Sequence, residues 1–211
     1  WTGGKDCNLA LLRAWRDSSL KVVALVVFRP KLAKFRAHPI DIMKMQAWNL
    51  QLPLLEVEVS NEPDYKTSYV NGMRGLKQEH GIEVIATGDM DLVGSMQRNW
   101  IEECGEECGI AAFLPLWQGE RLTLLNTMLA ENFEIVFSCV KSPHFDGSWI
   151  GKRIDDSVVK EMSNKTADGL DLGGEKGEYH TMVVGGPLFS SRLELPAFEA
   201  LELAGEDGQK E

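Results

Sequence analysis

The sequence predicts an α/β fold in which a parallel sheet is covered by helices on both faces. Two observations carry this prediction. Apolar runs of strand length alternate with segments of helical spacing through most of the 211 residues. The run Lys21–Phe28 is also almost continuously apolar and rich in β-branched residues, which is typical of a parallel strand buried on both faces.

The first part of the chain alternates regularly between the two kinds of element. The expected elements are a helix over Leu9–Trp15, a strand over Lys21–Phe28, a helix from Pro39 to Leu50, a strand over Leu54–Val59, a helix over Asp64–His80, a strand over Glu83–Thr87, a helix over Gln97–Cys108 and a strand over Ala112–Trp117. Pro39 fits the first turn of a helix, where a missing N–H costs nothing. Gly81 and Gly109 each follow a helical pattern, and glycine commonly ends a helix.

The alternation continues with a helix over Leu122–Glu131 and a strand over Phe133–Val140, which the same pattern places in the parallel sheet. The pattern then changes, and the expected elements are a helix over Ile154–Met162 and a strand over Tyr179–Val184. Between the last two lies Ser163–Gly177, which is polar and glycine-rich and therefore more typical of a binding loop than of a helix or strand.

Composition limits the classes of partner and the compartment. The formal net charge of −10 disfavours broad contact with nucleic-acid phosphates. No stretch approaches the roughly 20 apolar residues of a membrane helix, so we expect no membrane partner. Four scattered cysteines do not resemble a secreted disulfide framework, which indicates a cytoplasmic protein with reduced thiols. Cys104 and Cys108 favour helix packing over zinc binding, because no second ligand pair stands out.

A candidate phosphate loop stands at the start of the chain, in Thr2-Gly3-Gly4-Lys5-Asp6-Cys7. Paired glycines let backbone N–H groups converge on an anion, and the helix that follows directs its positive end toward the same place. Lys5 adds a cation for phosphate oxygens, and Asp6 could hold Mg²⁺. The spacing is not that of a Walker loop. These six residues alone fit a plain strand-to-helix turn equally well.

The position of this loop raises an expectation about the chain itself. A phosphate loop in a doubly wound fold normally follows a central strand, whereas here it begins at residue 2. We therefore expect that a preceding strand is missing from the sequence. Because its neighbours would keep unpaired backbone groups, we also expect the chain alone to be poorly soluble.

A second candidate site is the segment Gly174–Thr181. Glu175 and Glu178 lie three residues apart and could bind an ammonium or trimethylammonium group, coordinate Mg²⁺ or accept a proton. Tyr179 could offer an aromatic face to a quaternary ammonium. The alternative is a solvated acidic turn that only leads into a strand, and the residues alone favour this alternative.

Four further polar residues have two interpretations each. Asp89, beside Gly88, follows a predicted strand at the edge where open α/β sheets bind ligands, but it could equally cap a helix. Arg98 could bind a phosphate or carboxylate, or be a surface charge. His38 could lie over a bound ligand or be a solvated loop residue, and the second interpretation is favoured. His180 could bind substrate or lie at the sheet edge.

The loop resembles the PP-loop of the ATP pyrophosphatases, usually written SGGKDS, with Thr2 and Cys7 in place of its two serines. Since a thiol is a weaker hydrogen-bond donor than a hydroxyl, Cys7 could lower nucleotide affinity. Further segments resemble the diphthine–ammonia ligase group in the same order along the chain: Gly88-Asp89 with Gln97-Arg98, Pro115-Leu116-Trp117, Gly174–Thr181, and Gly186-Pro187-Leu188-Phe189. The resemblance covers Trp1 to Phe189.

The resemblance implies a fold and an organisation into domains. It implies a Rossmann-like fold of the adenine nucleotide alpha hydrolase type over residues 1–116, which would bind the nucleotide. A smaller C-terminal α+β portion, residues 117–204, would bind the acceptor substrate. Residues 205–211 are charged, and we expect them to form a disordered tail.

The resemblance also implies a reaction: ATP-dependent amidation by ammonia of the carboxylate of diphthine, a modified histidine on elongation factor 2, with release of AMP and pyrophosphate. Two alternatives stay open. One is a PP-loop ATPase that acts on another acceptor such as tRNA, which the acidic charge disfavours. The other is an adenine-nucleotide-binding module without turnover. A homodimer also stays open.

Site residues are carried over from the matched motifs. The catalytic group would be Lys5, Asp6, Glu175 and Glu178. The group that binds ATP would be Thr2, Gly3, Gly4, Lys5, Asp6, Cys7, His38, Gly88 and Asp89, with Mg²⁺ on Asp6. The group that binds the acceptor would be Arg98, Gly174, Glu175, Gly177, Glu178, Tyr179, His180 and Thr181.

Overall fold

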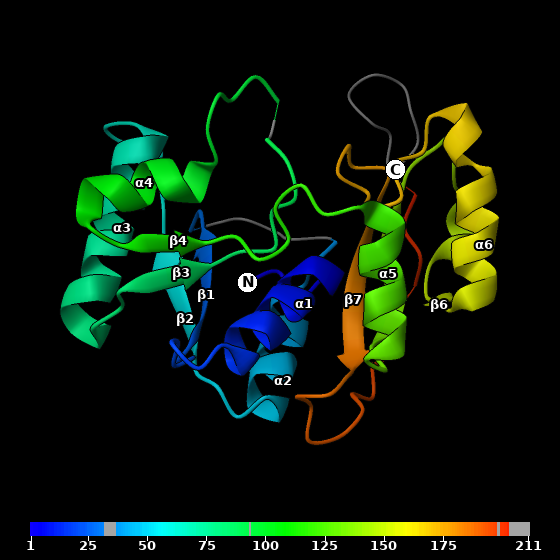
Figure 1. The fold of residues 1–211 in the computed structure, drawn as a ribbon, viewed down its shortest axis with the longest axis horizontal. Helices are drawn as coiled ribbons and strands as arrows, with labels where there is room; N and C mark the ends of the chain where they lie inside the picture. The colour runs from blue at the N-terminus through cyan, green and yellow to red at the C-terminus, as the bar shows by residue number, and fades with distance from the viewer. Residues whose placement is uncertain (32–36, 93, 198, 203–211) are drawn as a thin grey trace. The chain divides into compact units, whose positions relative to one another are not determined.

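The structure, a computed structural model, describes residues 1–31, 37–92, 94–197 and 199–202 (Figure 1). In chain order its helices and strands are α1 (Lys5–Arg16), β1 (Leu25–Arg29), α2 (Ile40–Asn49), β2 (Leu54–Glu58), α3 (Tyr65–His80), β3 (Val84–Ala86), α4 (Trp100–Cys108), β4 (Ala111–Phe113), α5 (Arg121–Ala130), β5 (Glu134–Val140), β6 (Arg153–Ile154), α6 (Asp156–Asn164) and β7 (Tyr179–Gly185). The tail that was predicted over residues 205–211 lies outside the described residues.

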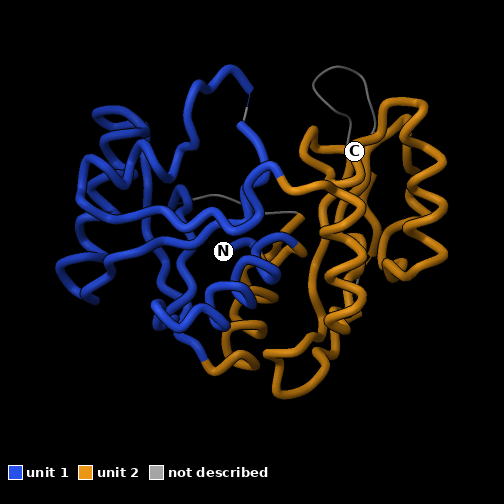
Figure 2. The backbone as a smooth tube through the Cα atoms, in the orientation of Figure 1, with its two compact units in different colours: residues 1–2, 6–34, 52–118 blue, residues 3–5, 35–51, 119–211 orange. Residues whose placement is uncertain are grey.

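The chain divides into two compact units (Figure 2). Unit 1 consists of residues 1–2, 6–34 and 52–118, and unit 2 of residues 3–5, 35–51 and 119–211. Residues 3–5 and α2 thus join the C-terminal part of the chain in unit 2. The predicted domain boundary after residue 116 stays a prediction.

Unit 1 has the parallel strands that the sequence predicted. β1 pairs with β2 in register from Leu25 opposite Leu54, and β3 pairs with β4 from Val84 opposite Ala111. Among the described residues these are two separate two-stranded sheets. The fold is therefore a mixed α/β fold with parallel strands, and the finer Rossmann-like arrangement stays a prediction.

Two strands of unit 1 are shorter than predicted, and in both cases a proline accounts for it. The predicted strand Lys21–Phe28 begins only at Leu25, because the register places Ala24 opposite Pro53, which has no N–H to continue the ladder. The predicted strand Ala112–Trp117 ends at Phe113. Pro115 then lies in a turn that the N–H of Trp117 closes on the carbonyl oxygen of Leu114 at 3.2 Å.

Helix ends in unit 1 follow local capping chemistry. α3 begins after Asp64, whose carboxylate accepts a hydrogen bond from the N–H of Thr67 at 2.8 Å, and it ends at Gly81 with φ 66°. α4 begins at Trp100 rather than at Gln97 as predicted. The reason is Asn99, whose side chain caps the first turn and stops the helix from extending backward.

A buried apolar cluster holds α3 and α4 against β3 and β4. Its buried members are Val59, Tyr69, Val70, Met73, Ile85, Ile101, Cys104 and Ile110. The rings of Phe28 and Tyr69 stack with centroids 3.9 Å apart. Burial raises the pKa of the Cys104 thiol to about 11, and the Cys108 thiol contacts the carbonyl oxygen of Cys104 at 3.4 Å. Both cysteines are free thiols, in line with their predicted packing role.

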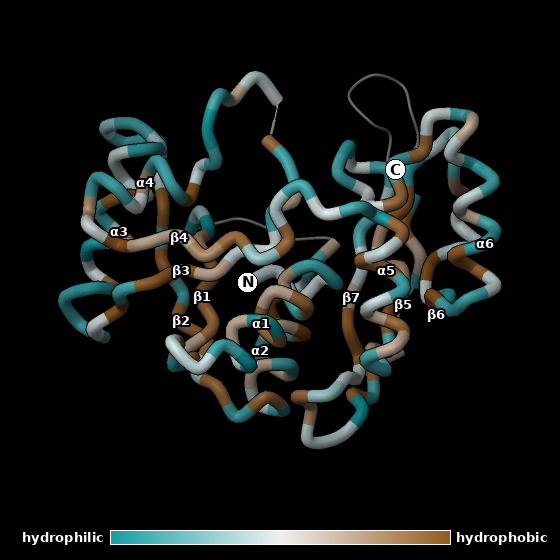
Figure 3. Tube along the Cα trace, in the orientation of Figure 1, coloured by the Kyte–Doolittle hydropathy of each residue, from teal (hydrophilic) through white to brown (hydrophobic). Residues whose placement is uncertain are grey.

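Unit 2 is built on a three-stranded antiparallel sheet in the order β6-β5-β7. β5 pairs with β7 from Glu134 opposite Gly185 to Val140 opposite Tyr179. The regular alternation had suggested that β5 joins the parallel sheet, and this was wrong. An α+β arrangement of the C-terminal portion, by contrast, is what the structure has. In Figure 3 the strands β5 and β7 carry apolar stretches, while α6 mixes polar and apolar residues.

α6 and an aromatic cluster complete unit 2. The predicted helix Ile154–Met162 begins instead at Asp156, because Asp155 caps it by accepting a hydrogen bond from Val158 N–H at 2.9 Å. The cluster consists of Phe137, Phe145, Trp149 and Tyr179, whose ring centroids lie 4.8 to 5.7 Å apart. Across the described residues, no helix is long and apolar enough to span a membrane.

Candidate active site

The glycines of the predicted phosphate loop lie beside β7 in unit 2. The N–H of Val183 donates to the carbonyl oxygen of Gly3 at 3.1 Å, and the N–H of Lys5 donates to Thr181 Oγ1 at 3.1 Å. The predicted phosphate loop and the segment Gly174–Thr181 are therefore in direct contact, although Lys5 and Thr181 are 176 residues apart in the chain. This contact defines the candidate site.

Lys5 is buried, with 4% of its surface exposed. Its ammonium donates a short hydrogen bond to the carbonyl oxygen of Gly173 and lies 5.2 Å from the centre of the Tyr179 ring. Gly173 belongs to the glycine-rich loop 171–178, which contains Gly174, Glu175, Gly177 and Glu178, residues predicted to bind the acceptor. The cation predicted for phosphate binding thus contacts the loop predicted for acceptor binding.

The two glutamates of this loop occupy different environments. Glu178 is 7% exposed, and its two carboxylate oxygens accept hydrogen bonds from the N–H groups of Asp171 at 2.9 Å and Lys176 at 3.0 Å. The side chain of Glu178 therefore closes the loop on itself. Glu175, on the same loop, is exposed. The spacing of three residues, which made the two carboxylates look equivalent, does not reveal this difference.

Backbone conformation explains the glycines of the loop. Gly174 and Gly177 have φ of 75° and 79°, a region that favours glycine. Tyr179, which follows, is only 2% exposed, and its hydroxyl donates to the carbonyl oxygen of Leu172 at 2.5 Å. The ring that was considered as a face for a quaternary ammonium is thus covered, and it holds the loop against β7.

Two histidines complete the part of the site in unit 2. The rings of His38 and His180 meet edge to face with centroids 5.2 Å apart. A Cβ on Gly4 would lie 3.5 Å from His38 Cε1 and 3.2 Å from the carbonyl oxygen of Thr181. His38 therefore lies against Gly4 of the phosphate loop, and its ring meets that of His180, which was predicted to bind the acceptor.

Gln46 was missed by the sequence analysis. It is fully buried in α2, and its side-chain amide donates to the carbonyl oxygens of Gly3 at 2.9 Å and Val183 at 2.8 Å. The sequence does contain one sign of this role. Gln46 lies between the buried apolar residues Met43 and Ala47 on one helix face, and a glutamine buried there needs a hydrogen-bond partner.

The remaining predicted residues of the phosphate loop lie in unit 1. Thr2 Oγ1 and Cys7 Sγ are 3.3 Å apart. Gly88 lies directly against the first turn of α1, since a Cβ on it would come within 2.5 Å of the carbonyl carbon of Asp6. A close backbone approach of this kind explains why Gly88 has no side chain.

The carboxylate of Asp89 connects two elements of unit 1. One oxygen accepts from Thr87 Oγ1 at 2.8 Å and the other from the amide of Asn99 at 2.7 Å. Arg98 forms a two-pronged ion pair with Glu106, at 2.8 and 2.5 Å, and its side chain is 49% exposed. This pair raises the pKa of Arg98 and lowers that of Glu106. Arg98 is thus engaged in a surface ion pair.

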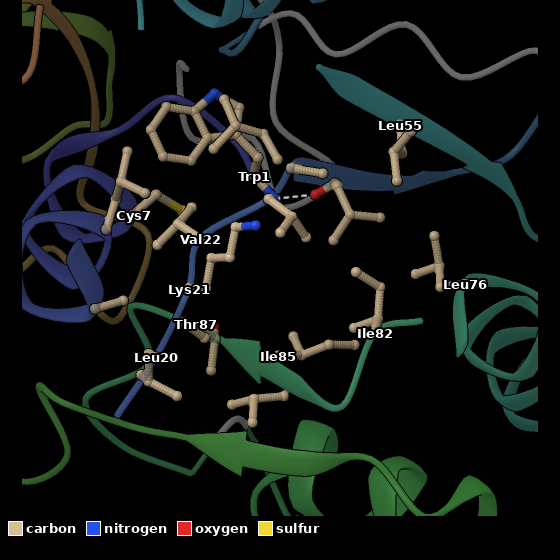
Figure 4. A pocket seen from close by; sticks show the side chains of 18 of the residues that line it. Trp1, Cys7, Leu20, Lys21, Val22, Leu55, Leu76, Ile82, Ile85 and Thr87 are labelled. Atoms are coloured by element: carbon tan, nitrogen blue, oxygen red, sulfur yellow. Dashed lines mark hydrogen bonds between the residues drawn. The ribbon is translucent and has the colours of Figure 1, made fainter. Parts of the chain in front are cut away.

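Unit 1 also contains an apolar cavity of about 160 Å³ (Figure 4). Most of its wall is formed by aliphatic side chains of α1, β1, α3 and β3, among them Leu11, Leu25, Leu76 and Ile85. The amino group of Trp1 donates to the carbonyl oxygen of Val26 at its rim. Such a lining does not suit the phosphates of a nucleotide.

The side chains that could bind a metal ion do not gather at one place in the described part of the chain. Among the residues that the structure describes, no cluster of three or more His, Cys, Asp or Glu side chains could hold a metal ion. Asp6 lies in the first turn of α1 as a single carboxylate. One carboxylate is enough where phosphate oxygens and water supply the other ligands of Mg²⁺.

Known families match both parts of the chain. The family described as diphthamide synthase N-terminal domain matches residues 1–112, and that described as diphthamide synthase C-terminal domain matches residues 120–209. The chain belongs to the diphthamide synthase family.

Three relatives of the chain carry the name diphthine–ammonia ligase. The relative from Schizosaccharomyces pombe is 24% identical over 221 residues, which cover 95% of the chain but only 36% of the relative. Those from Rattus norvegicus and Mus musculus are 24% and 26% identical over 225 residues, covering 95% of the chain and 82% of each relative.

A solved structure, described as a predicted subunit of tRNA methyltransferase from Methanocaldococcus jannaschii, also matches. The match covers 88% of the chain and 94% of the other chain at 16% identity and a TM-score of 0.45. A likeness at that level carries no functional conclusion.

Proposed function

We propose that the chain is an ATP-dependent carbon–nitrogen ligase that amidates the carboxylate of diphthine on elongation factor 2 with ammonia. The observation that carries this proposal is the contact of Lys5 with Gly173, which joins the phosphate loop to the loop expected to bind the acceptor. The family and the name of its relatives support the same reaction.

The chemistry explains why ATP is needed. Ammonia does not displace oxide from a carboxylate, because oxide is a poor leaving group. In the first step, a carboxylate oxygen attacks the α-phosphorus of ATP, and pyrophosphate leaves. In the second step, ammonia attacks the carbonyl carbon, AMP leaves with the former carboxylate oxygen, and a base takes the surplus proton from nitrogen. Each step needs groups that stabilise a developing negative charge.

The phosphate loop supplies such groups. α1 begins at Lys5, so the positive end of the helix and the lysine ammonium would bind phosphate oxygens. Asp6 would hold Mg²⁺, which supplies further positive charge to the phosphates when it is bound. Lys5 would exchange the carbonyl oxygen of Gly173 for a phosphate oxygen as pyrophosphate leaves.

The two glutamates receive separate roles in this proposal. Because both oxygens of Glu178 are bound by backbone N–H groups, Glu178 holds the acceptor loop in shape. Glu175, which is exposed on the same loop, would bind ammonium and accept its proton. His180, which is exposed near the start of β7, would contact the acceptor.

The test is pyrophosphate release from Mg-ATP, measured with ammonium and with elongation factor 2 that carries diphthine. We expect release to require both acceptors and to fall by about 100-fold or more in Lys5→Ala. Lys160→Ala, which removes an exposed lysine of α6, is the matched control and should keep wild-type release.

Other products would point to other functions. Release of ADP in place of AMP would exclude the adenylation mechanism. Release that depends on tRNA and not on the protein acceptor would assign a different substrate. ATP binding without release under any acceptor would indicate a nucleotide-binding module.

A further inference from the structure

Gln46 is a polar residue in an apolar setting. It lies in the middle of α2 with 0% of its surface exposed, and Met43 and Ala47 beside it are buried as well. An amide at such a position costs free energy unless all of its hydrogen-bonding groups find partners. An apolar residue would fill the same space without that requirement, so the partners of Gln46 indicate what it is for.

Those partners belong to the phosphate loop and to β7. The two N–H groups of the amide donate to Gly3 O at 2.9 Å and to Val183 O at 2.8 Å. The carbonyl oxygen of Gly3 also accepts from the N–H of Val183 at 3.1 Å. A flipped amide would bring its oxygen against two carbonyl oxygens, so the hydrogen bonds fix its orientation.

The other side of the amide restricts Gly3 sterically. Gly3 has φ 77°, and a Cβ on it would lie 2.0 Å from Gln46 Oε1. Gly3 is therefore held by three constraints: a left-handed conformation, a hydrogen bond from β7, and the Gln46 amide packed against its Cα. Its peptide sets the direction in which Gly4 and Lys5 leave toward their own partners.

We propose that Gln46 is a positioning residue for the phosphate loop, which it fixes through the peptide of Gly3. This inference rests on the proposed function, because it takes the loop to be where ATP binds. Gln46 does not contact the reacting atoms. It acts through Gly3, whose peptide sets the direction in which the backbone continues to Gly4 and Lys5.

A residue with a purely structural role is available for comparison on the same helix. Asn49 is 7% exposed, and its amide oxygen accepts from Ser190 Oγ and Ser191 N–H, both at 3.2 Å. Its amide nitrogen donates to Ser191 Oγ at 3.1 Å. Asn49 thus makes a similar set of bonds from α2, but to a segment that does not include the phosphate loop.

The experiment compares Gln46→Met with Asn49→Leu in the full chain. Each substitution replaces a buried amide of α2 by an apolar side chain of similar shape. Three quantities are measured: the melting temperature, the kcat and KM for Mg-ATP in pyrophosphate release, and amide hydrogen exchange of peptides that contain Gly3 to Lys5.

We expect the two variants to lose similar melting temperature but to differ at the loop. In Gln46→Met, kcat/KM for Mg-ATP should fall about 30-fold, since displacements of about 1 Å cost up to a factor of about 100. KM for ammonium should not change, and exchange at the loop should be faster. In Asn49→Leu, kcat/KM should stay within about threefold of wild type and loop exchange should be unchanged.

Equal kinetic losses and equal loop exchange in the two variants would overturn the inference, and so would a Gln46→Met variant that matches wild type. Should Gln46→Met not fold, Gln46→Asn, which withdraws the amide by one methylene, is compared with Asn49→Ala in the same way. A wild-type chain that neither binds nor cleaves ATP would refute the proposed function. The hydrogen-exchange comparison would then still decide whether Gln46 orders the loop.

Discussion

The two units treat the polar residues of their motifs in opposite ways. In unit 2, Lys5 and Glu178 are buried; Lys5 bonds to the main chain of the loop 171–178, and Glu178 bonds to main-chain N–H groups within that loop. In unit 1, Arg98 and Glu106, eight residues apart in the chain, form an exposed ion pair. Buried polar networks lose much when one member is removed, whereas exposed ion pairs contribute little. We therefore expect substitutions of the buried polar residues of unit 2 to have larger effects than those of the exposed pair in unit 1.

The sheets of the two units also differ, in the direction and length of their strand pairs. Unit 1 has short parallel pairs, of five residues for β1 with β2 and three residues for β3 with β4. Unit 2 has β5 and β7, seven residues each, paired over most of their length. β7 thus pairs with β5 along most of its length, with two irregularities in register, and the phosphate loop lies beside Thr181 and Val183. A rigid strand of this kind can hold a catalytic loop to the accuracy that catalysis needs.

The largest expected effect is that of Gly3→Ala in unit 2. The substitution would force a Cβ to within 2.0 Å of Gln46 Oε1 at a residue with φ 77°. Neither the backbone nor the buried amide can move without a large cost in free energy. We therefore expect pyrophosphate release to fall by about 100-fold and the melting temperature to drop by roughly 5 °C. Both quantities are measured on the same preparation.

Gly147→Ala is the control for that substitution. Gly147 also belongs to unit 2, but a Cβ on it would meet nothing within 4 Å. It should keep the activity and melting temperature of wild type. Wild-type activity in Gly3→Ala would mean that the loop is not held as tightly as its contacts indicate.

The second expected effect separates the two glutamates of the acceptor loop. A glutamine at position 178 can accept from only one of the two N–H groups that Glu178 now binds, and it presents its own NH₂ to the other. We expect Glu178→Gln to lower the melting temperature by about 5 °C and pyrophosphate release by about tenfold. Differential scanning fluorimetry and the release assay give the two values.

Glu175→Gln should behave in the opposite way. Because Glu175 is exposed, the melting temperature of the Glu175→Gln variant should stay within about 1 °C of wild type. If this carboxylate accepts the proton, the ammonium-dependent rate of the variant should fall by a factor of about 100. Equal effects of the two substitutions on stability and rate would remove the distinction between a loop-closing and a reacting carboxylate.

Features that depend on local chemistry were predictable from the sequence. Gly81 and Gly109 end their helices in the left-handed conformation as expected, with φ of 66° and 67°. The mixed α/β class and the parallel strands also followed from the alternation of apolar runs. Each of these depends on residues within a few positions of one another, so a single sequence contains the information.

Features that depend on distant partners were not predictable. The antiparallel pairing of β5 is decided by β7, whose strand starts 39 residues after β5 ends, at Tyr179 against Val140. The burial of Glu178 and the covering of the Tyr179 ring arise from how the loop folds onto itself. Gln46 acts on Gly3 across 43 positions. Pattern and spacing along the chain do not contain these contacts.

The smallest expected effect is that of Arg98→Ala in unit 1. Hydrogen bonds from Arg98 lower the pKa of Glu106 below its ordinary value of 4.5. A carboxylate with a lowered pKa stabilises the folded state above that ordinary value, and its contribution is lost as the pH falls through the lowered value. Arg98→Ala should therefore lower the melting temperature by roughly 1 °C near pH 7, and the difference from wild type should shrink as the pH falls below the ordinary pKa of a glutamate.

Glu106→Gln is the matched substitution, because it breaks the same ion pair while leaving the guanidinium in place. If the pair only stabilises the start of α4, both variants should release pyrophosphate at the wild-type rate within about twofold. If Arg98 binds the acceptor, as its motif suggested, Arg98→Ala alone should raise KM for the protein acceptor. In that outcome, a residue of unit 1 would act on the substrate from a surface ion pair. The difference drawn between the polar residues of the two units would then no longer hold.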